Sequence, residues 1–225
     1  MVKKTSSFKK LALNFTNRVL DNYKPDNMCF TVSFPLSLHL ANYNFKNTIR
    51  AGRFYDDSIK DGTPHFWIKL DSEIENIIDP TAKQFYPNLT EPICFMEKPK
   101  YYRELSQSLK KEWFAYSYDK WSKGLLNHDE EDKSKSIIPI QALQSTKNPD
   151  IKTLLDINLR AAAILNTDCE KLNLEQSILH KKYFECIYRV IQKFHDKEEM
   201  KKLNLPNEFQ SLLNKVLNNS SSLLR

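Results

Sequence analysis

The sequence predicts an α+β protein in which a cysteine at the start of a helix packs against an antiparallel sheet. Helical apolar stripes occur near both ends of the chain, and strand-like segments lie between residues 45 and 79. Cys29 directly follows a Pro-Asp-Asn breaker and opens an apolar block. The chain has only three glycines, well separated, so it lacks the glycine-rich phosphate loops of P-loop and Rossmann proteins.

Composition indicates a globular chain whose charge is concentrated at one end. The 225 residues are 40% hydrophobic and 28% charged, which is typical of a folded, soluble protein. The net charge is +6, and residues 1–24 account for +5 of it through six lysines and arginines against one aspartate. The remaining chain is close to neutral, so we do not expect a nucleic-acid-binding face.

The cysteines indicate neither a disulfide framework nor a metal site. The four are widely spaced and form no C-x-x-C pair: Cys29, Cys94, Cys169 and Cys186. We therefore expect no zinc site, no cofactor and reduced thiols. Residues 1–24 have no uninterrupted apolar core of a signal peptide, and no run of ~18 apolar residues predicts a membrane span. These features favour a cytoplasmic protein.

The first two predicted elements are helices. Residues 6–20 form an amphipathic pattern whose lysines could touch an anionic membrane or nucleic acid, although a docked helix with a solvated face is the simpler interpretation. Residues 28–43 predict a second helix opening near Cys29. Proline removes a hydrogen bond inside a helix, so this helix either kinks at Pro35 or starts its regular part at Ser33.

Three strands and then a helical region follow. We expect the strands at residues 45–55, 65–70 and 74–79, and an irregular proline-containing connection after Phe85. From residue 100 the pattern becomes helical. The later predicted segments are an aromatic stretch at 113–121, a polar linker at 127–136, and helices at 150–165, 179–194 and 207–217.

This pattern divides the chain into a core at residues 1–126, the linker at 127–136, and a helical region at 137–225. The apolar stripe of residues 179–194, which includes Leu179 and Cys186, should pack on neighbouring helices. The helical region could shape substrate access or bind a protein partner. The aromatic stretch is either a partner-binding surface or core packing.

The strand pair at residues 65–79 brings a histidine and an aspartate together. A turn centred on Ser72 pairs apolar residues with apolar residues and Lys69 with Glu75, which stabilises that register. It sets His65 opposite Asp79 on one face of the sheet, with β-carbons ~5 Å apart.

A histidine, an aspartate and a cysteine in this arrangement can perform nucleophilic chemistry. An aspartate that binds one imidazole nitrogen fixes the tautomer and leaves the other nitrogen as a base. Cys29 at a helix start lies near peptide N–H groups that favour the thiolate. Each feature also has a structural interpretation: the His65–Asp79 pair could tie off a strand end, and Cys29 could be a small buried apolar residue.

The motifs "MCFTVSFPLSLHL", "HFWIKL" and "IIDPTAKQF" carry a resemblance. Their order of helix-borne Cys, His and Asp resembles the papain-like/transglutaminase-like cysteine enzyme superfamily. More narrowly, they are similar to largely uncharacterised bacterial and bacteriophage proteins with a Cys block, a His-Trp pair and an Asp-x-Thr-Ala-x-Gln-Phe motif. The similarity covers residues 26–105, with Phe66 inserted here between His65 and Trp67.

This resemblance implies a thiol-dependent hydrolase, such as a thiol protease, or an acyl transferase. Cys29 would be the nucleophile, His65 the base and Asp79 the orienting carboxylate of a catalytic triad. The bond attacked would be an amide, ester or isopeptide bond in a protein or peptide-like substrate. The alternative is a non-catalytic binding or inhibitory protein on the same fold, phage-encoded or accessory.

Three further residues are candidates for substrate binding or oxyanion stabilisation. Papain has a glutamine six residues before its cysteine, where this chain has Tyr23. The oxyanion donors would therefore be backbone N–H groups together with Asn27. Trp67 and Gln84 complete the predicted site, although Gln84 could equally be a solvated surface residue.

Overall fold

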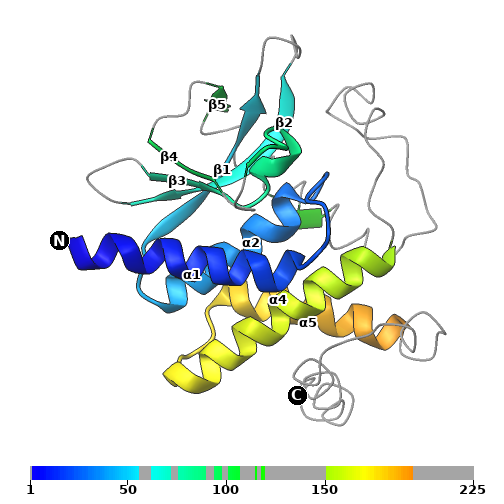
Figure 1. Ribbon diagram of the computed structural model, residues 1–225. Helices are drawn as coiled ribbons and strands as arrows, with labels where there is room; N and C mark the ends of the chain where they lie inside the picture. The colour runs from blue at the N-terminus through cyan, green and yellow to red at the C-terminus, as the bar shows by residue number, and fades with distance from the viewer. Residues whose placement is uncertain are drawn as a thin grey trace.

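The computed structural model describes residues 2–55, 62–71, 76–89, 94–97, 101–106, 115, 118–119 and 151–194, and its architecture is α+β (Figure 1). Within these residues, helices cover one side of a single sheet. In chain order the elements are α1 (Val2–Leu20), α2 (Cys29–Asn42), β1 (Asn47–Phe54), β2 (Thr63–Leu70), β3 (Asn76–Asp79), the 3₁₀ helix η1 (Ala82–Gln84), β4 (Cys94–Glu97), β5 (Tyr102–Glu104), α4 (Ile151–Leu172) and α5 (Ile178–Phe194). None of the described helices combines the length and apolarity that a bilayer span requires.

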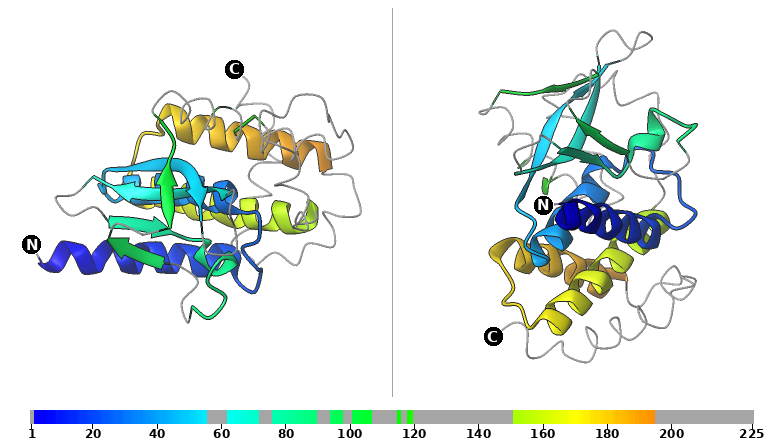
Figure 2. Two further views of the ribbon diagram at one scale, coloured as in Figure 1. Left: turned by 90° about the horizontal axis from the view of Figure 1, so that it is seen from above. Right: turned by 60° about the vertical axis from the view of Figure 1, so that its left-hand side comes forward.

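The described sheet has five strands in the order β4-β3-β2-β1-β5, and every neighbouring pair is antiparallel. Figure 2 shows the helices gathered on one face of it. Successive side chains of a strand point to opposite faces. Phe66 and Ile68 of β2 accordingly join the core shared with the helices, whereas Trp67 joins a smaller aromatic cluster with Phe54 and Tyr102.

Helix α2 is the centre of the core, with 11 of its 14 residues buried. It contacts α1, α4, β1 and β2, which fits a sequence that is apolar on nearly all sides. The helix begins at Cys29 and continues through Pro35, so a start at Ser33 is wrong. Burial of α2 on every side offsets the hydrogen bond that Pro35 cannot donate.

The N-terminal helix is docked rather than free. Its apolar stripe, with Phe8, Ala12, Phe15 and Val19, is buried in the core shared with α2 and α4. The loop after α1 is tied to α4, because the Tyr23 hydroxyl donates to Asp156 Oδ2 at 2.8 Å. This bond helps to fix the segment that leads into α2.

The structure corrects the predicted strand register. Ile68 lies opposite Ile78 and Leu70 lies opposite Asn76, a shift of two residues from the predicted pairing. The longer connection lets the two fully buried isoleucines face each other under the helices. Because side chains alternate with a period of two, a shift of two keeps every side chain on its predicted face.

Other boundaries also differ from the predictions. Strands β4 and β5 lie where we predicted an irregular connection and the start of a helix, because edge pairing with β3 and β1 overrides the local pattern. Helix α4 extends to Leu172, and α4 and α5 share one core with α1, α2 and the sheet. The predicted linker at 127–136 and helix at 207–217 lie outside the described residues.

The predicted stripe on α5 is buried only in part. Cys186 lies in the core as predicted, with 5% of its surface exposed. Leu179 is 45% exposed, so its predicted packing is wrong. It belongs to the first turn of α5, next to the exposed Ile178, before the helix turns its apolar face onto the core.

Gly52 occupies a position in β1 with no room for a side chain. A β-carbon there would lie 2.2 Å from the Arg103 carbonyl oxygen and 2.5 Å from Trp67 Cη2. We expect Gly52→Ala to destabilise the fold by about 1–3 kcal/mol, because the β5 backbone must move. Urea unfolding measures this, with the exposed Thr48→Ala on the same strand as control, expected within about 0.5 kcal/mol of wild type. Equal unfolding free energies for both variants would contradict the close approach.

Candidate active site

Cys29 is the first residue of α2 and is half-buried. The N-cap residue is Met28, and no side chain caps the helix there. The first backbone N–H groups of a helix have no partner within the helix and carry the positive end of its dipole. Cys29 therefore sits at a helix start whose N–H groups can stabilise negative charge.

His65 and Asp79 meet across β2 and β3. In the observed register Asp79 lies diagonally across from His65 and on the same face of the sheet. The imidazole Nε2 and the carboxylate Oδ2 are 2.7 Å apart, and both side chains are fully buried. The predicted contact is therefore present, although the two residues are not directly opposite each other.

The Asp79 carboxylate accepts four hydrogen bonds. Oδ2 accepts from His65 Nε2 and, at 2.6 Å, from the Tyr102 hydroxyl. Oδ1 accepts from the Thr81 backbone N–H at 2.9 Å and from the Thr81 hydroxyl at 3.1 Å. Burial alone would raise the pKa of Asp79, but the His65 charge and these donors lower it below its ordinary value of 3.8. The group is thus held as a carboxylate.

The His65 ring lies among aromatic side chains. Its ring centroid is 4.8 Å from Phe85, 5.7 Å from Tyr102 and 6.0 Å from Trp67. Burial lowers the pKa of His65, but the Asp79 carboxylate outweighs it, and with a smaller contribution from Cys29 the pKa rises from 6.5 to about 10. The site therefore favours an imidazolium between a carboxylate and a thiol.

Cys29 lies close enough to the His65 imidazole to contribute to the rise in its pKa. Since Nε2 is bound to Asp79, Nδ1 is the nitrogen left for the thiol. Of the other cysteines whose side chains the structure describes, Cys169 and Cys186 are buried. The structure thus places Cys29 near the hydrogen-bonded His65–Asp79 pair.

Gln84 lies beside the same imidazole nitrogen. Its amide Nε2 is 3.4 Å from His65 Nδ1 and 3.1 Å from the Thr81 hydroxyl. Because the Thr81 hydroxyl donates to Asp79, it accepts from Gln84, which orients the amide N–H group toward the site. Gln84 is half-buried and is not a freely solvated residue.

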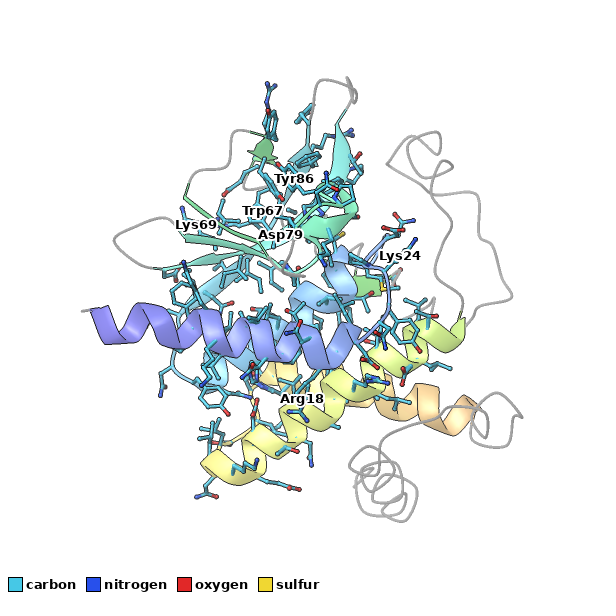
Figure 3. The ribbon with its side chains drawn as sticks, viewed as in Figure 1. Arg18, Lys24, Trp67, Lys69, Asp79 and Tyr86 are labelled. Atoms are coloured by element: carbon cyan, nitrogen blue, oxygen red, sulfur yellow. The ribbon has the colours of Figure 1, made fainter. Side chains whose placement is uncertain are left out.

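Trp67 and Asn27 take different positions. Trp67 is fully buried next to the His65 ring, and its indole N–H has no hydrogen-bond partner among the described residues. Figure 3 shows Trp67 and Asp79 close together on the sheet above α2. Asn27 is half-buried, two residues before Cys29, and adopts a positive φ of 58° that shapes the entry to α2.

Sequence reasoning missed Tyr102, Thr81 and Gly52. The Asp-Pro-Thr stretch is an observable signal for Thr81, because an aspartate side chain often accepts the N–H two residues later. Tyr102 gave no such signal, since its segment reads as helical. Gly52 pairs with His65 across β1 and β2, a relation that exists only once the register is known.

A second buried His–Asp pair lies on the C-terminal half of α2. His39 Nδ1 is 2.5 Å from Asp168 Oδ2 on α4, and the Tyr43 hydroxyl donates to Asp168 Oδ1 at 3.1 Å. This pair joins two helices through the same groups that form the His65–Asp79 pair. Among the described residues, no cluster of three or more His, Cys, Asp or Glu side chains could hold a metal ion.

No protein-family model matches the chain, and no curated protein and no solved structure shows significant similarity to it. The resemblance carried by the Cys, His and Asp motifs therefore stays a prediction, and the chemistry rests on the geometry of the site.

The His65–Asp79 pair should make stability depend on pH. The pKa of His65 is raised on folding, so its contribution is fully present below about pH 6.5 and is lost as the pH rises toward about 10. The lowered pKa of Asp79 means that its contribution is present above about pH 4 and is lost as the pH falls through the folded value.

Urea unfolding between pH 6.5 and 9 measures the histidine contribution. Cys29→Ser removes the thiol's own titration from both proteins being compared. We expect Cys29→Ser to lose stability by up to about 1.4 kcal/mol per pH unit relative to Cys29→Ser/His65→Gln, which lacks the imidazole. Parallel stability profiles would show that the imidazole gains no proton affinity on folding.

Proposed function

We propose that this protein is a thiol-dependent hydrolase or acyl transferase with Cys29 as nucleophile, His65 as base and acid, and Asp79 as the orienting carboxylate. The observation that carries the proposal is the position of one imidazole between a fully hydrogen-bonded carboxylate and a thiol at a helix start. The helix-borne cysteine on an antiparallel sheet agrees with a papain-like/transglutaminase-like arrangement, which the sequence motifs also suggest.

In the first step, Cys29 Sγ attacks the carbonyl carbon of an amide, ester or isopeptide bond. A sulfur–carbon bond forms, and the carbonyl π electrons move onto oxygen. The bond to the leaving group then breaks, and the proton on His65 Nδ1 moves to the leaving nitrogen or oxygen. Asp79 holds the imidazolium through Nε2 and so keeps Nδ1 aimed at the sulfur.

Two kinds of donor could stabilise the oxyanion of this step. Backbone N–H groups at the start of α2 lie beside Cys29, and the Gln84 amide lies beside His65 Nδ1. Donors held in place before the reaction stabilise developing charge without reorganisation. Tyr23 cannot take the role of papain's upstream glutamine, because its hydroxyl is bound to Asp156.

In the second step, water or an amine attacks the thioester while His65 Nδ1 accepts its proton. The carbon–sulfur bond breaks, and the thiolate returns to Cys29. Cys29 is half-buried whereas His65 has no exposed surface. We therefore expect a substrate to meet the site at the thiol and at the half-buried Gln84.

The pH profile of Cys29 alkylation by iodoacetamide tests the triad. We expect Asp79→Asn and His65→Ala each to slow alkylation at pH 6 by about tenfold or more, since the thiolate loses its imidazolium partner. The double variant should add little, because the residues act as one unit. Mass spectrometry of the Cys29 peptide measures each rate.

Asp168→Asn is the matched control for this profile. It alters the second buried His–Asp pair, which lies on the C-terminal half of α2, and should leave the Cys29 profile unchanged. If all these variants give the wild-type curve, the His65–Asp79 contact is purely structural. A binding or inhibitory role, which needs no thiol chemistry, would then become the better explanation.

A trapped acyl group tests the covalent step directly. With p-nitrophenyl acetate as a probe, we expect a burst of about one p-nitrophenol per folded chain and an acetyl group on Cys29. Cys29→Ala should abolish the burst, because it removes the attacking sulfur and little else. Release of p-nitrophenol that survives this substitution would place the chemistry elsewhere.

A further inference from the structure

We infer that Tyr102 is a positioning residue of the proposed triad and that Gly52 clears the space through which β5 reaches it. The buried Tyr102 hydroxyl donates to Asp79 Oδ2, the same carboxylate oxygen that binds His65 Nε2. The hydroxyl donates to the carboxylate that holds the imidazole, so we infer that it acts through Asp79. The inference rests on the proposed function for its catalytic meaning.

The Tyr102–Asp79 bond requires a strongly curled sheet. Tyr102 lies on β5 and Asp79 on β3, with β1 and β2 between them. Neighbouring strands are about 4.8 Å apart, so a flat sheet would separate β5 from β3 by about 14 Å, more than the two side chains can bridge. A bond of 2.6 Å therefore shows that the sheet curls toward its aromatic face.

Gly52 lies on β1 between β2 and β5, at a point of close approach. It pairs with His65 on one side and with Glu104 of β5 on the other. A β-carbon at this position would overlap both the Arg103 carbonyl and the Trp67 ring. Glycine in a strand interior often marks such a bend or close approach. The missing side chain thus permits the approach of β5 that brings Tyr102 to Asp79.

Sharing Oδ2 between two donors has a chemical consequence. The Tyr102 hydroxyl stabilises the charged form of Asp79 and contributes to the lowering of its pKa. It also fixes the direction of the oxygen that His65 faces. Loss of this hydroxyl should let Asp79 take up a proton at a higher pH, and the imidazolium–thiolate pair should then be lost at that higher pH.

Tyr102→Phe tests this inference, because it removes the hydroxyl and keeps the ring that packs on Trp67 and His65. We expect the pH at which Cys29 alkylation slows on acidification, the acid limb of the profile, to rise by about one unit. Loss of a hydrogen bond to a charged group predicts a shift of this size. The His65 ring-nitrogen shifts, followed by NMR against pH, should move in parallel. Gly52→Ala, which keeps the hydroxyl but displaces β5, should shift the limb in the same direction.

Tyr183→Phe is the matched control. It removes another buried tyrosine hydroxyl, which donates to the Asn158 carbonyl at 3.2 Å among the helices. Its profile should superimpose on wild type. A wild-type profile for Tyr102→Phe, or equal shifts in Tyr102→Phe and Tyr183→Phe, would overturn the inference.

The two proposals can fail separately. If Cys29 is alkylated at the same rate in the wild type and in His65→Ala at every pH, the proposed function fails. The NMR titration of His65 still decides whether Tyr102 controls the Asp79 carboxylate, because that measurement needs no reactive thiol.

Discussion

The buried Asp79 carboxylate is the constraint on which the rest of the site depends. A charge without partners inside a protein costs far more than a fold can offset, so its acceptor positions must be filled. Here β2, the turn after β3, and β5 supply the four donors. These bonds therefore fix the curl of the sheet and the direction of the His65 ring together. The chemistry of the site and the shape of the sheet have one physical cause.

The two buried His–Asp pairs differ in what surrounds the imidazole. His39 meets Asp168 much as His65 meets Asp79, but the Nε2 of His39 is buried with no hydrogen-bond partner among the described residues, and its ring packs on Phe15. His65 instead has Cys29 nearby, and its Nδ1 lies 3.4 Å from the Gln84 amide nitrogen. What distinguishes the pairs is the group at the other side of the imidazole. Helix α2 carries both environments, with a thiol at its first residue and a buried His–Asp contact in its last turn.

The sequence was sufficient to predict the α+β class, the helix start at Cys29 and the His65–Asp79 contact, because these follow from local periodicity and a breaker. The predicted register was wrong by two residues, yet the period of two preserved the face and hence the contact. Tyr102 could not be found in this way. Its strand has three residues and reads as the start of a helix, and its bond to Asp79 depends on curvature that Gly52 permits from fifty residues away. A contact between strands that are distant in the sequence leaves no trace in the local pattern of apolar and polar residues.

In the proposed mechanism, hydrogen bonds tie both the Gln84 oxyanion donor and the base to Asp79. Asp79 accepts from the Thr81 hydroxyl, which accepts from Gln84, and the Gln84 amide Nε2 lies 3.4 Å from Nδ1 of His65, which is bound to Asp79. A glutamine placed before the cysteine, as in papain, would be independent of the imidazole. Here the position before the cysteine is occupied by Tyr23, which anchors the loop to α4, and the donor comes from the turn after the aspartate. The Asp79 carboxylate then orients both the Gln84 donor, through Thr81, and the His65 base.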